Sequence, residues 1–356
     1  AHIGVLKVLE EAEIPLDYIA GTSMGAIIGG LYSLGYTTRE LDSMVRSQNW
    51  PSLLSDFVPR DKKMLNEKEA GDRYLIQLGV ALNKKLSLPS GVMSGQNVLN
   101  LLNEMTIGYH DKDINFDSLP IPFACVTYDM VKGEQVVFRK GNLPLAIRAS
   151  MSIPGAFAPV VMDSMVLVDG GIYNNFPVDV IREMGAEVII GVDLFGGPHD
   201  ASGLNSIMGL IDQITTIMGR TQYNLNCENL DLHLRPDIKP YTSASFSTEA
   251  IDSLLVRGER VARQNWDSLM VVKDKLYGTE ICDVTVPPRP NILLDSDTLR
   301  IGKISFRGLT NNEEFLIRPA FRVDENSIVT KGELNSAIGR LRGSGAFSFV
   351  TYTLES

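Results

Sequence analysis

The chain has 356 residues, of which 44% are apolar and 21% are charged, and its net charge is −10. This composition predicts a folded protein of about two domains, and the excess of carboxylates disfavours nucleic acid and anionic lipid as electrostatic partners. No apolar run reaches the ~18 residues that would predict a membrane-spanning helix.

The first element is a short helix, because apolar residues recur at mostly helical spacing between residues 3 and 9. A buried strand follows at residues 18–20, and Gly21-Thr22-Ser23-Met24-Gly25 then fits the pattern G-x-S-x-G. An apolar helix follows over residues 26–34. Strand, G-x-S-x-G and helix in this order predict a nucleophile elbow, a tight turn that presents a serine hydroxyl.

Ser23 is therefore the candidate nucleophile, and the N–H of Met24 is a candidate donor to an oxyanion. We expect Gly21 and Gly25 to let the strand and the helix approach each other without a Cβ clash. A capping box at Thr37 and Glu40 predicts that the next helix begins there.

The middle of the chain alternates strand-like and helix-like segments, which predicts an α/β sheet covered on both faces and mostly parallel. We expect a hairpin at 74–88, strands at 121–128, 134–139, 166–168 and 186–192, and helices at 98–105, 144–149, 206–226 and 248–276. Three prolines between residues 287 and 290 predict a domain boundary. The expected division is a first domain at 1–277, a linker at 278–298 and a second domain at 299–356.

The second domain has the pattern of a small α/β unit. Alternating residues predict a strand at 303–307, and capping boxes at Thr310/Glu313 and Thr330/Glu333 predict two helices. Another strand is expected at 347–354. It would have no partner strand within the printed sequence, so we expect the domain to be incomplete.

A serine hydroxyl needs a base to become a nucleophile. Asp169 is the leading candidate, because it follows a core strand and precedes Gly170 and Gly171, which leave room for a substrate. The competing arrangement is a triad of Ser23 with Asp169 or Asp193 and with His199 or His233. The three cysteines and four histidines have no disulfide or metal-ligand spacing, so no metal and no cofactor are expected.

Residues 1–277 resemble the patatin-like phospholipases, because four motifs occur in that family's order. These are AHIGVL at residues 1–6, GTSMG at 21–25, ASMSIPG at 149–155 and DGGIYNNFP at 169–177. The resemblance implies a three-layer α/β/α domain and a Ser23–Asp169 dyad that cleaves fatty acyl esters through an acyl-enzyme, with no histidine required. It also implies a glycine-rich oxyanion loop upstream of Ala1 that supplies the other donors.

Residues 299–356 resemble a POTRA domain in their expected β-α-α-β order and in the stretch LRGSGAFSFV at 341–350. Patatin followed by POTRA implies a secreted or outer-membrane enzyme of a Gram-negative bacterium. A downstream outer-membrane β-barrel and a phospholipid or other acyl-ester substrate at a membrane surface are then expected as partners. A homodimer is left open. The alternative function is a non-catalytic binding module in which the elbow is only a scaffold.

Overall fold

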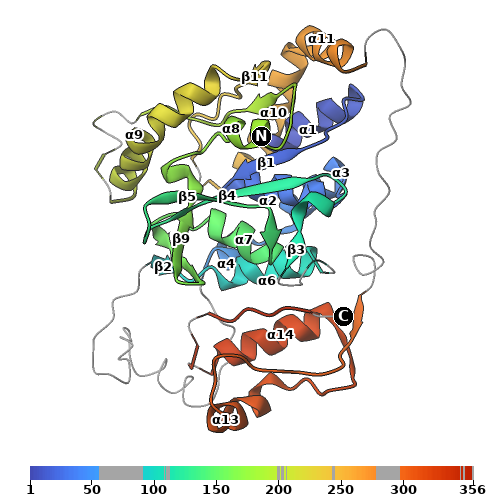
Figure 1. Ribbon diagram of the computed structural model, residues 1–356, viewed down its shortest axis with the longest axis vertical. Helices are drawn as coiled ribbons and strands as arrows, with labels where there is room; N and C mark the ends of the chain where they lie inside the picture. The colour runs from blue at the N-terminus through green and yellow to red at the C-terminus, as the bar shows by residue number, and fades with distance from the viewer. Residues whose placement is uncertain are drawn as a thin grey trace.

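The computed structural model describes residues 1–55, 91–107, 109, 113–198, 201, 204–205, 207–242, 245–277, 297–344, 346–347 and 349–354. Figure 1 shows a larger unit above and a smaller C-terminal unit, with helices α13 and α14, below it. The hairpin predicted at 74–88 and nearly all of the linker predicted at 278–298 lie outside the described residues. The division into separate domains therefore stays a prediction.

The larger unit is organised around a five-stranded sheet in the order β1-β4-β9-β8, with β5 also paired to β4. Its strands are β1 (Ile19–Thr22), β4 (Phe123–Asp129), β5 (Glu134–Phe138), β8 (Val160–Met162) and β9 (Met165–Asp169). Among these pairs β1 and β4 are parallel, whereas β4–β5, β4–β9 and β8–β9 are antiparallel.

The expectation of a mostly parallel sheet is therefore wrong. Tight turns explain the antiparallel pairs β4–β5 and β8–β9, because short connections can join only antiparallel strands. Asp163 and Ser164 connect β8 to β9 with φ of 48° and 69°, the left-handed pair that suits a two-residue hairpin. The apolar run at 186–192 that favoured a parallel sheet does contain a parallel strand, at residues 190–192, but that strand pairs with residues 232–234 outside the five-stranded sheet.

Helices cover both faces of this sheet. On one side Phe123 and Cys125 of β4 pack with α2 and α7, and on the other Ala124 and Val126 pack with α8. The helices described in the larger unit are α1 (His2–Glu11), α2 (Met24–Ser33), α3 (Thr38–Ser47), α4 (Trp50–Leu53), α6 (Gln96–Met105), α7 (Leu143–Ser150), α8 (Val178–Glu183), α9 (Ile207–Cys227), α10 (Thr248–Gln264) and α11 (Trp266–Tyr277). Across the described residues, none of the helices is both long enough and apolar enough to cross a membrane.

The remaining short elements form three two-stranded pairs and two 3₁₀ turns. The pairs are β2 (Gly91–Met93) with β7 (Gly155–Phe157), β3 (Ile114–Asn115) with β6 (Lys140–Gly141), and β10 (Ile190–Val192) with β11 (Leu232–Leu234); the turns are η2 (Phe116–Ser118) and η3 (Gly170–Ile172). The capping box at Thr37 and Glu40 is present at the start of α3. The helix predicted at 248–276 is interrupted at Asn265, which separates α10 from α11.

The C-terminal unit has the order β12 (Thr298–Arg300), α13 (Asn311–Phe321), β13 (Ile328–Thr330) and α14 (Lys331–Arg342). Both predicted capping boxes are confirmed. The β-α-α-β order is wrong, because β13 lies between the two helices and pairs antiparallel with β12.

The two strands predicted in this unit, at 303–307 and 347–354, are not strands in its described residues. Pairing with the β13 segment ends at Gly302, whose carbonyl accepts from the Asn326 N–H at 3.2 Å. The N–H of Ile304 then donates to the Glu325 side chain at 2.9 Å instead of to a neighbouring strand. Ile304 and Phe306 still pack on the core of the unit. The alternation of apolar and polar residues at 303–307 therefore indicated which side chains are buried, but not that the segment pairs with another strand.

The C-terminal unit packs against α6 of the larger unit. The Gln96 side chain donates to the Val350 carbonyl and accepts from the Val350 N–H, both at 2.7 Å. Asn335 of α14 donates to Glu104 at 2.9 Å, and Ile107 is buried in the core of the C-terminal unit. The segment after α14 is thus held by a buried side chain of the larger unit.

A close crossing of α1 and α10 gives a test of the packing. A Cβ on Gly4 would lie 2.6 Å from the backbone nitrogen of Glu259, so one helix must shift. Gly4→Ala should lower the free energy of unfolding by about 1–3 kcal/mol, although alanine normally favours a helix. Thermal melting checks this. Gly302→Ala is the matched control, because its Cβ would meet no described atom within 4 Å, and equal melting of the two variants would contradict the crossing.

Candidate active site

The predicted elbow is present at Ser23. The residue lies between β1 and α2 with φ 54° and ψ −120°, a strained conformation for a residue with a side chain. A Cβ on Gly21 would lie 2.6 Å from the backbone nitrogen of Ala26, so only glycine fits there. A Cβ on Gly25 would meet only the His2 ring at 3.9 Å among the described atoms, so the steric requirement falls on Gly21 alone.

Hydrogen bonds from distant parts of the chain hold the elbow. The Ser23 N–H donates to Ser150 Oγ at 2.9 Å, and Ser150 Oγ donates to the Val126 carbonyl at 2.6 Å. The Thr22 hydroxyl donates to the Asn174 carbonyl at 2.8 Å. Met24 is the first residue of α2, so its N–H has no acceptor within the helix and remains a candidate oxyanion donor.

Asp169 lies at the end of β9 and is brought to the Ser23 side chain. The carboxyl group is buried, with 6% of the residue exposed, and Oδ1 accepts from the Gly171 N–H at 2.8 Å. Burial raises the pKa of Asp169 to about 6, although hydrogen bonds from the Ser23 side chain and the Gly171 backbone oppose the rise. The group is therefore a stronger base than an ordinary aspartate and is still ionised at neutral pH.

The glycines after Asp169 have different roles. A Cβ on Gly170 would lie 2.5 Å from the Val126 carbonyl oxygen, so the turn needs glycine to pass this close to β4. A Cβ on Gly171 would lie 3.0 Å from Asp169 Oδ1, beside the carboxylate. The two glycines thus let the turn fold back on Asp169.

Asn174 connects the loop after Asp169 to three other elements. Its amide nitrogen donates to Gln135 of β5 at 2.9 Å and to Asp179 of α8 at 2.8 Å, and its amide oxygen accepts from Asn226 of α9 at 3.0 Å. The sequence motif contained Asn174, but a supporting role was not predicted, because its partners are distant in the chain.

Arg148 is a second support that the sequence did not reveal. It is fully buried in α7 and donates to Ser152 Oγ at 2.6 Å and to the Ser94 carbonyl at 2.7 Å. The Ser152 carbonyl in turn accepts from the Asp169 N–H at 3.0 Å. Arg148 therefore fixes the segment that contacts both Ser23 and Asp169.

His233 of the competing triad is not brought to Ser23. His233 Nε2 lies 2.9 Å from Asp193 Oδ2, which also accepts from the Tyr223 hydroxyl at 2.7 Å, and no described hydrogen bond joins this cluster to Ser23. His199 lies outside the described residues. In the described part of the chain no group of three or more His, Cys, Asp or Glu side chains could hold a metal ion.

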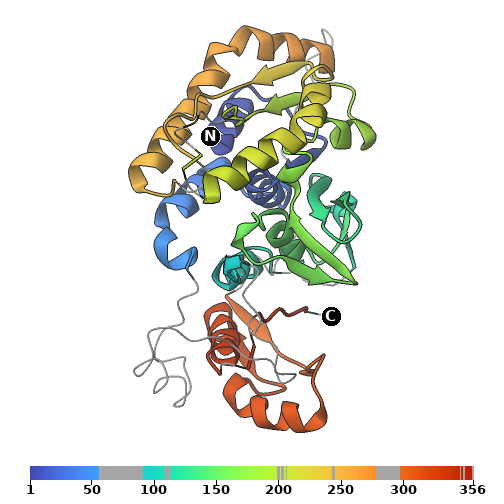
Figure 2. The same ribbon diagram turned by 90° about the vertical axis from the view of Figure 1, so that its left-hand side faces the viewer.

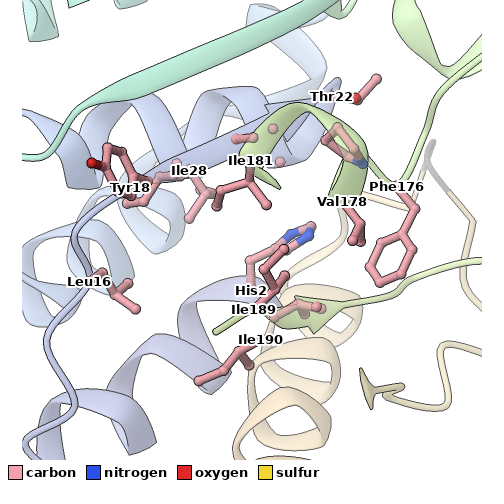
Figure 3. A pocket seen from close by; sticks show the side chains of 18 of the residues that line it. His2, Leu16, Tyr18, Thr22, Ile28, Phe176, Val178, Ile181, Ile189 and Ile190 are labelled. Carbon is pink, nitrogen blue, oxygen red and sulfur yellow. The ribbon is translucent and has the colours of Figure 1, made fainter. Parts of the chain in front are cut away.

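A cavity of about 170 Å³ adjoins the elbow, between β1 and β10. Gly21, Thr22 and Gly25 form part of its wall, and most other lining residues are apolar. Figure 3 shows the His2 ring within this space, close to Ile189 and Val178. Burial and the neighbouring amino terminus lower the pKa of His2 to about 3, so this ring is neutral at physiological pH. Neither Ser23 nor Asp169 lines the cavity.

Comparison with known proteins places these features in one family. Residues 1–182 match the patatin-like phospholipase family. An uncharacterized NTE family protein of Mycobacterium tuberculosis is 32% identical over 196 residues, which cover 55% of this chain and 46% of that protein.

Two animal proteins also match. A patatin-like phospholipase domain-containing protein of Caenorhabditis elegans is 32% identical over 273 residues, covering 69% of this chain and 18% of that protein. Patatin-like phospholipase domain-containing protein 7 of Rattus norvegicus is 29% identical over 208 residues, covering 58% of this chain and 13% of that protein. The chain thus spans less than half the length of these curated relatives. Because the family match includes the elbow, Asp169 and over half of the sequence, the chain belongs to the patatin-like phospholipase family.

Proposed function

We propose that the chain is a lipid acyl hydrolase of the phospholipase A, lysophospholipase or esterase type, with Ser23 as nucleophile and Asp169 as base. The observation that carries the proposal is the strained Ser23, with its side chain on a buried carboxylate whose pKa is raised to about 6. Relatives named as patatin-like phospholipase domain proteins support a lipid ester as the substrate class.

In the proposed reaction Ser23 Oγ attacks the ester carbonyl carbon while its proton passes to Asp169. The tetrahedral intermediate collapses, the bond to the alcohol breaks, and the alcohol leaves with the proton from Asp169. Water then attacks the acyl-enzyme and gives a proton to Asp169, and Ser23 regains a proton as the fatty acid departs. The Met24 N–H would donate to the negative oxygen of both intermediates.

Substitution of the dyad tests this mechanism. In the protein with its upstream residues, Ser23→Ala and Asp169→Asn should each lower kcat/KM for a p-nitrophenyl ester by about 10⁴–10⁶-fold, and the double variant should be no worse, because the two residues act as a unit. His233→Ala is the control and should stay within about tenfold of wild type. An Asp169→Asn protein with near wild-type activity would refute the dyad, and a loss above about 10³-fold in His233→Ala would favour the triad.

The raised pKa of Asp169 predicts opposite effects of pH on rate and stability. The base must be ionised, so kcat/KM should rise as pH passes through about 6. Protonated Asp169 favours the folded state, so its contribution to stability is complete below the ordinary value of 3.8 and is lost as pH rises through about 6. Initial rates and melting temperatures measure the two effects between about pH 4.5 and about pH 8, an interval that contains the pKa of about 6. A pH-independent rate across this interval would contradict the assignment of Asp169 as base.

We also propose that the other oxyanion donors belong to a glycine-rich segment upstream of Ala1, as the family resemblance implies. The position of α1 supports this, because His2 at its start lines the same cavity as Gly21, Thr22 and Gly25 of the elbow. Hydrolysis by residues 1–356 should then be lower than hydrolysis by the same chain with upstream residues by about 10²–10³-fold for each missing donor. Equal initial rates for the two proteins would show that the donors lie elsewhere.

A POTRA-like role for the C-terminal unit, with an outer-membrane or secreted location and a downstream β-barrel, is a separate proposal. It rests on the sequence resemblance of residues 341–350, because the β-α-α-β order expected for a POTRA domain is absent from the described residues. Deletion of residues 297–356 should abolish surface delivery in cells while ester hydrolysis by the purified remainder persists. Normal surface delivery of the shortened protein would contradict this role.

The alternative function is a non-catalytic binding module that uses the elbow as scaffold. It predicts that lysophospholipid binds but is never cleaved, even with the upstream residues present. The ionisable Asp169 beside Ser23 favours the hydrolase, because a scaffold has no need to bury a carboxylate there.

A further inference from the structure

Helix α9 presents an apolar stripe to solvent. Five large side chains, which we call the α9 stripe, are between 48% and 60% exposed: Leu210, Ile214, Ile217, Met218 and Leu225. Their spacing places them within about a third of the helix circumference, on one face. Single exposed apolar residues are ordinary, but a continuous row of five on one helix marks an interaction surface.

The opposite face of α9 packs on the proposed catalytic loop. A Cβ on Gly219 would lie 3.3 Å from the Tyr173 carbonyl oxygen and 3.5 Å from that of Gly171. Asn226 donates to the Asn174 side chain at 3.0 Å. The α9 stripe is therefore one helix diameter from the turn that contains Asp169, and its position is fixed relative to that turn.

Tyr173 extends the apolar surface toward the site. It is 42% exposed, and its hydroxyl lies 3.4 Å from Gln222 Oε1 of α9. A tyrosine with an exposed ring and a polar tip suits the boundary between lipid chains and water. The surface therefore runs from α9 to the residue two positions beyond Gly171.

The small number of charged residues in α9 indicates which kind of lipid surface the α9 stripe can bind. Residues 207–227 contain one acidic and one basic residue, Asp212 and Arg220, whereas the whole chain has a net charge of −10. An acidic protein is repelled by anionic lipid, so affinity must come from the apolar stripe itself. This favours a zwitterionic lipid surface.

Figures 1 and 2 place α9 on the outside of the larger unit, turned toward the viewer in Figure 2.

A second copy of the chain is the other candidate partner for the α9 stripe. Stable protein interfaces use about 20–30 residues on each side, far more than the five of the stripe and Tyr173. An interfacial helix, in contrast, needs only one apolar face that sinks into the headgroup boundary.

We propose that the α9 stripe docks the protein on zwitterionic phospholipid surfaces and holds the Ser23–Asp169 site against them. The inference rests on the proposed function, because a docked lipid surface would present the ester substrate to the Ser23–Asp169 site. Docking itself needs no catalysis, so it can be tested separately.

The test uses the full chain, vesicles of ether-linked phosphatidylcholine, which contain no ester to cleave, and sedimentation. Ile214→Glu/Ile217→Glu should weaken vesicle binding by at least about tenfold, because two apolar side chains of the stripe become charged. Hydrolysis of water-soluble p-nitrophenyl butyrate should change less than about twofold, because neither residue contacts the site. Val256→Glu/Val271→Glu is the matched control, since these valines are 51% and 57% exposed on α10 and α11, and it should bind vesicles like wild type.

Three outcomes would overturn the proposal: no vesicle binding by wild type, unchanged binding by the α9 variant, or equal loss in the control variant. Light scattering identifies the competing case, in which the α9 stripe is a dimer interface. In that case wild type is a dimer, the α9 variant is a monomer, and both bind vesicles equally. Vesicle binding that depends on the α9 stripe, in a protein that cleaves no ester even with its upstream residues present, would support docking and would refute the hydrolase instead.

Discussion

The site depends on one backbone constraint, the positive φ of 54° at Ser23. A residue with a side chain adopts this conformation only when its surroundings enforce it. Gly21 permits the close approach to α2, the Ser150 hydroxyl accepts from the Ser23 N–H, and Thr22 is bonded to the Asn174 carbonyl. Parallel pairing of β1 with β4 fixes the strand that enters the turn. The sheet and its covering helices thus hold one serine in a conformation that it would not adopt alone.

The same enclosure suits Asp169 to the base role proposed for it. Burial raises its pKa from 3.8 to about 6, which corresponds to roughly 3 kcal/mol against the ionised form. This is a net cost, because the Gly171 N–H and the Ser23 side chain already offset part of the effect of burial. Arg148 and Asn174 keep the two segments in place through bonds to five other elements or loops. The buried Asp169 carboxylate therefore lowers the stability of the folded protein, and the packing around the site compensates for this loss.

The local features of the site were predictable from the sequence, and the long-range ones were not. Strand, G-x-S-x-G and helix are neighbours in the chain, so the elbow at Ser23 followed from their order. Asp169 followed from its place after an apolar strand. Strand β8 was not predicted, because its turn to β9, Asp163-Ser164, lacks the glycine that signals a hairpin. Ser150 lies 127 residues from its partner Ser23, so only the fold brings them together.

The most direct test of the Ser23–Asp169 dyad is the site of covalent modification by a fluorophosphonate, mapped by mass spectrometry on the protein with its upstream residues. Only an activated serine should react, so the account predicts one adduct, on Ser23, in the wild-type protein and none in Asp169→Asn. The adduct should form more slowly as pH falls below about 6, where Asp169 becomes protonated. An adduct on another serine, or equal labelling of Ser23 without the Asp169 carboxylate, would contradict the account.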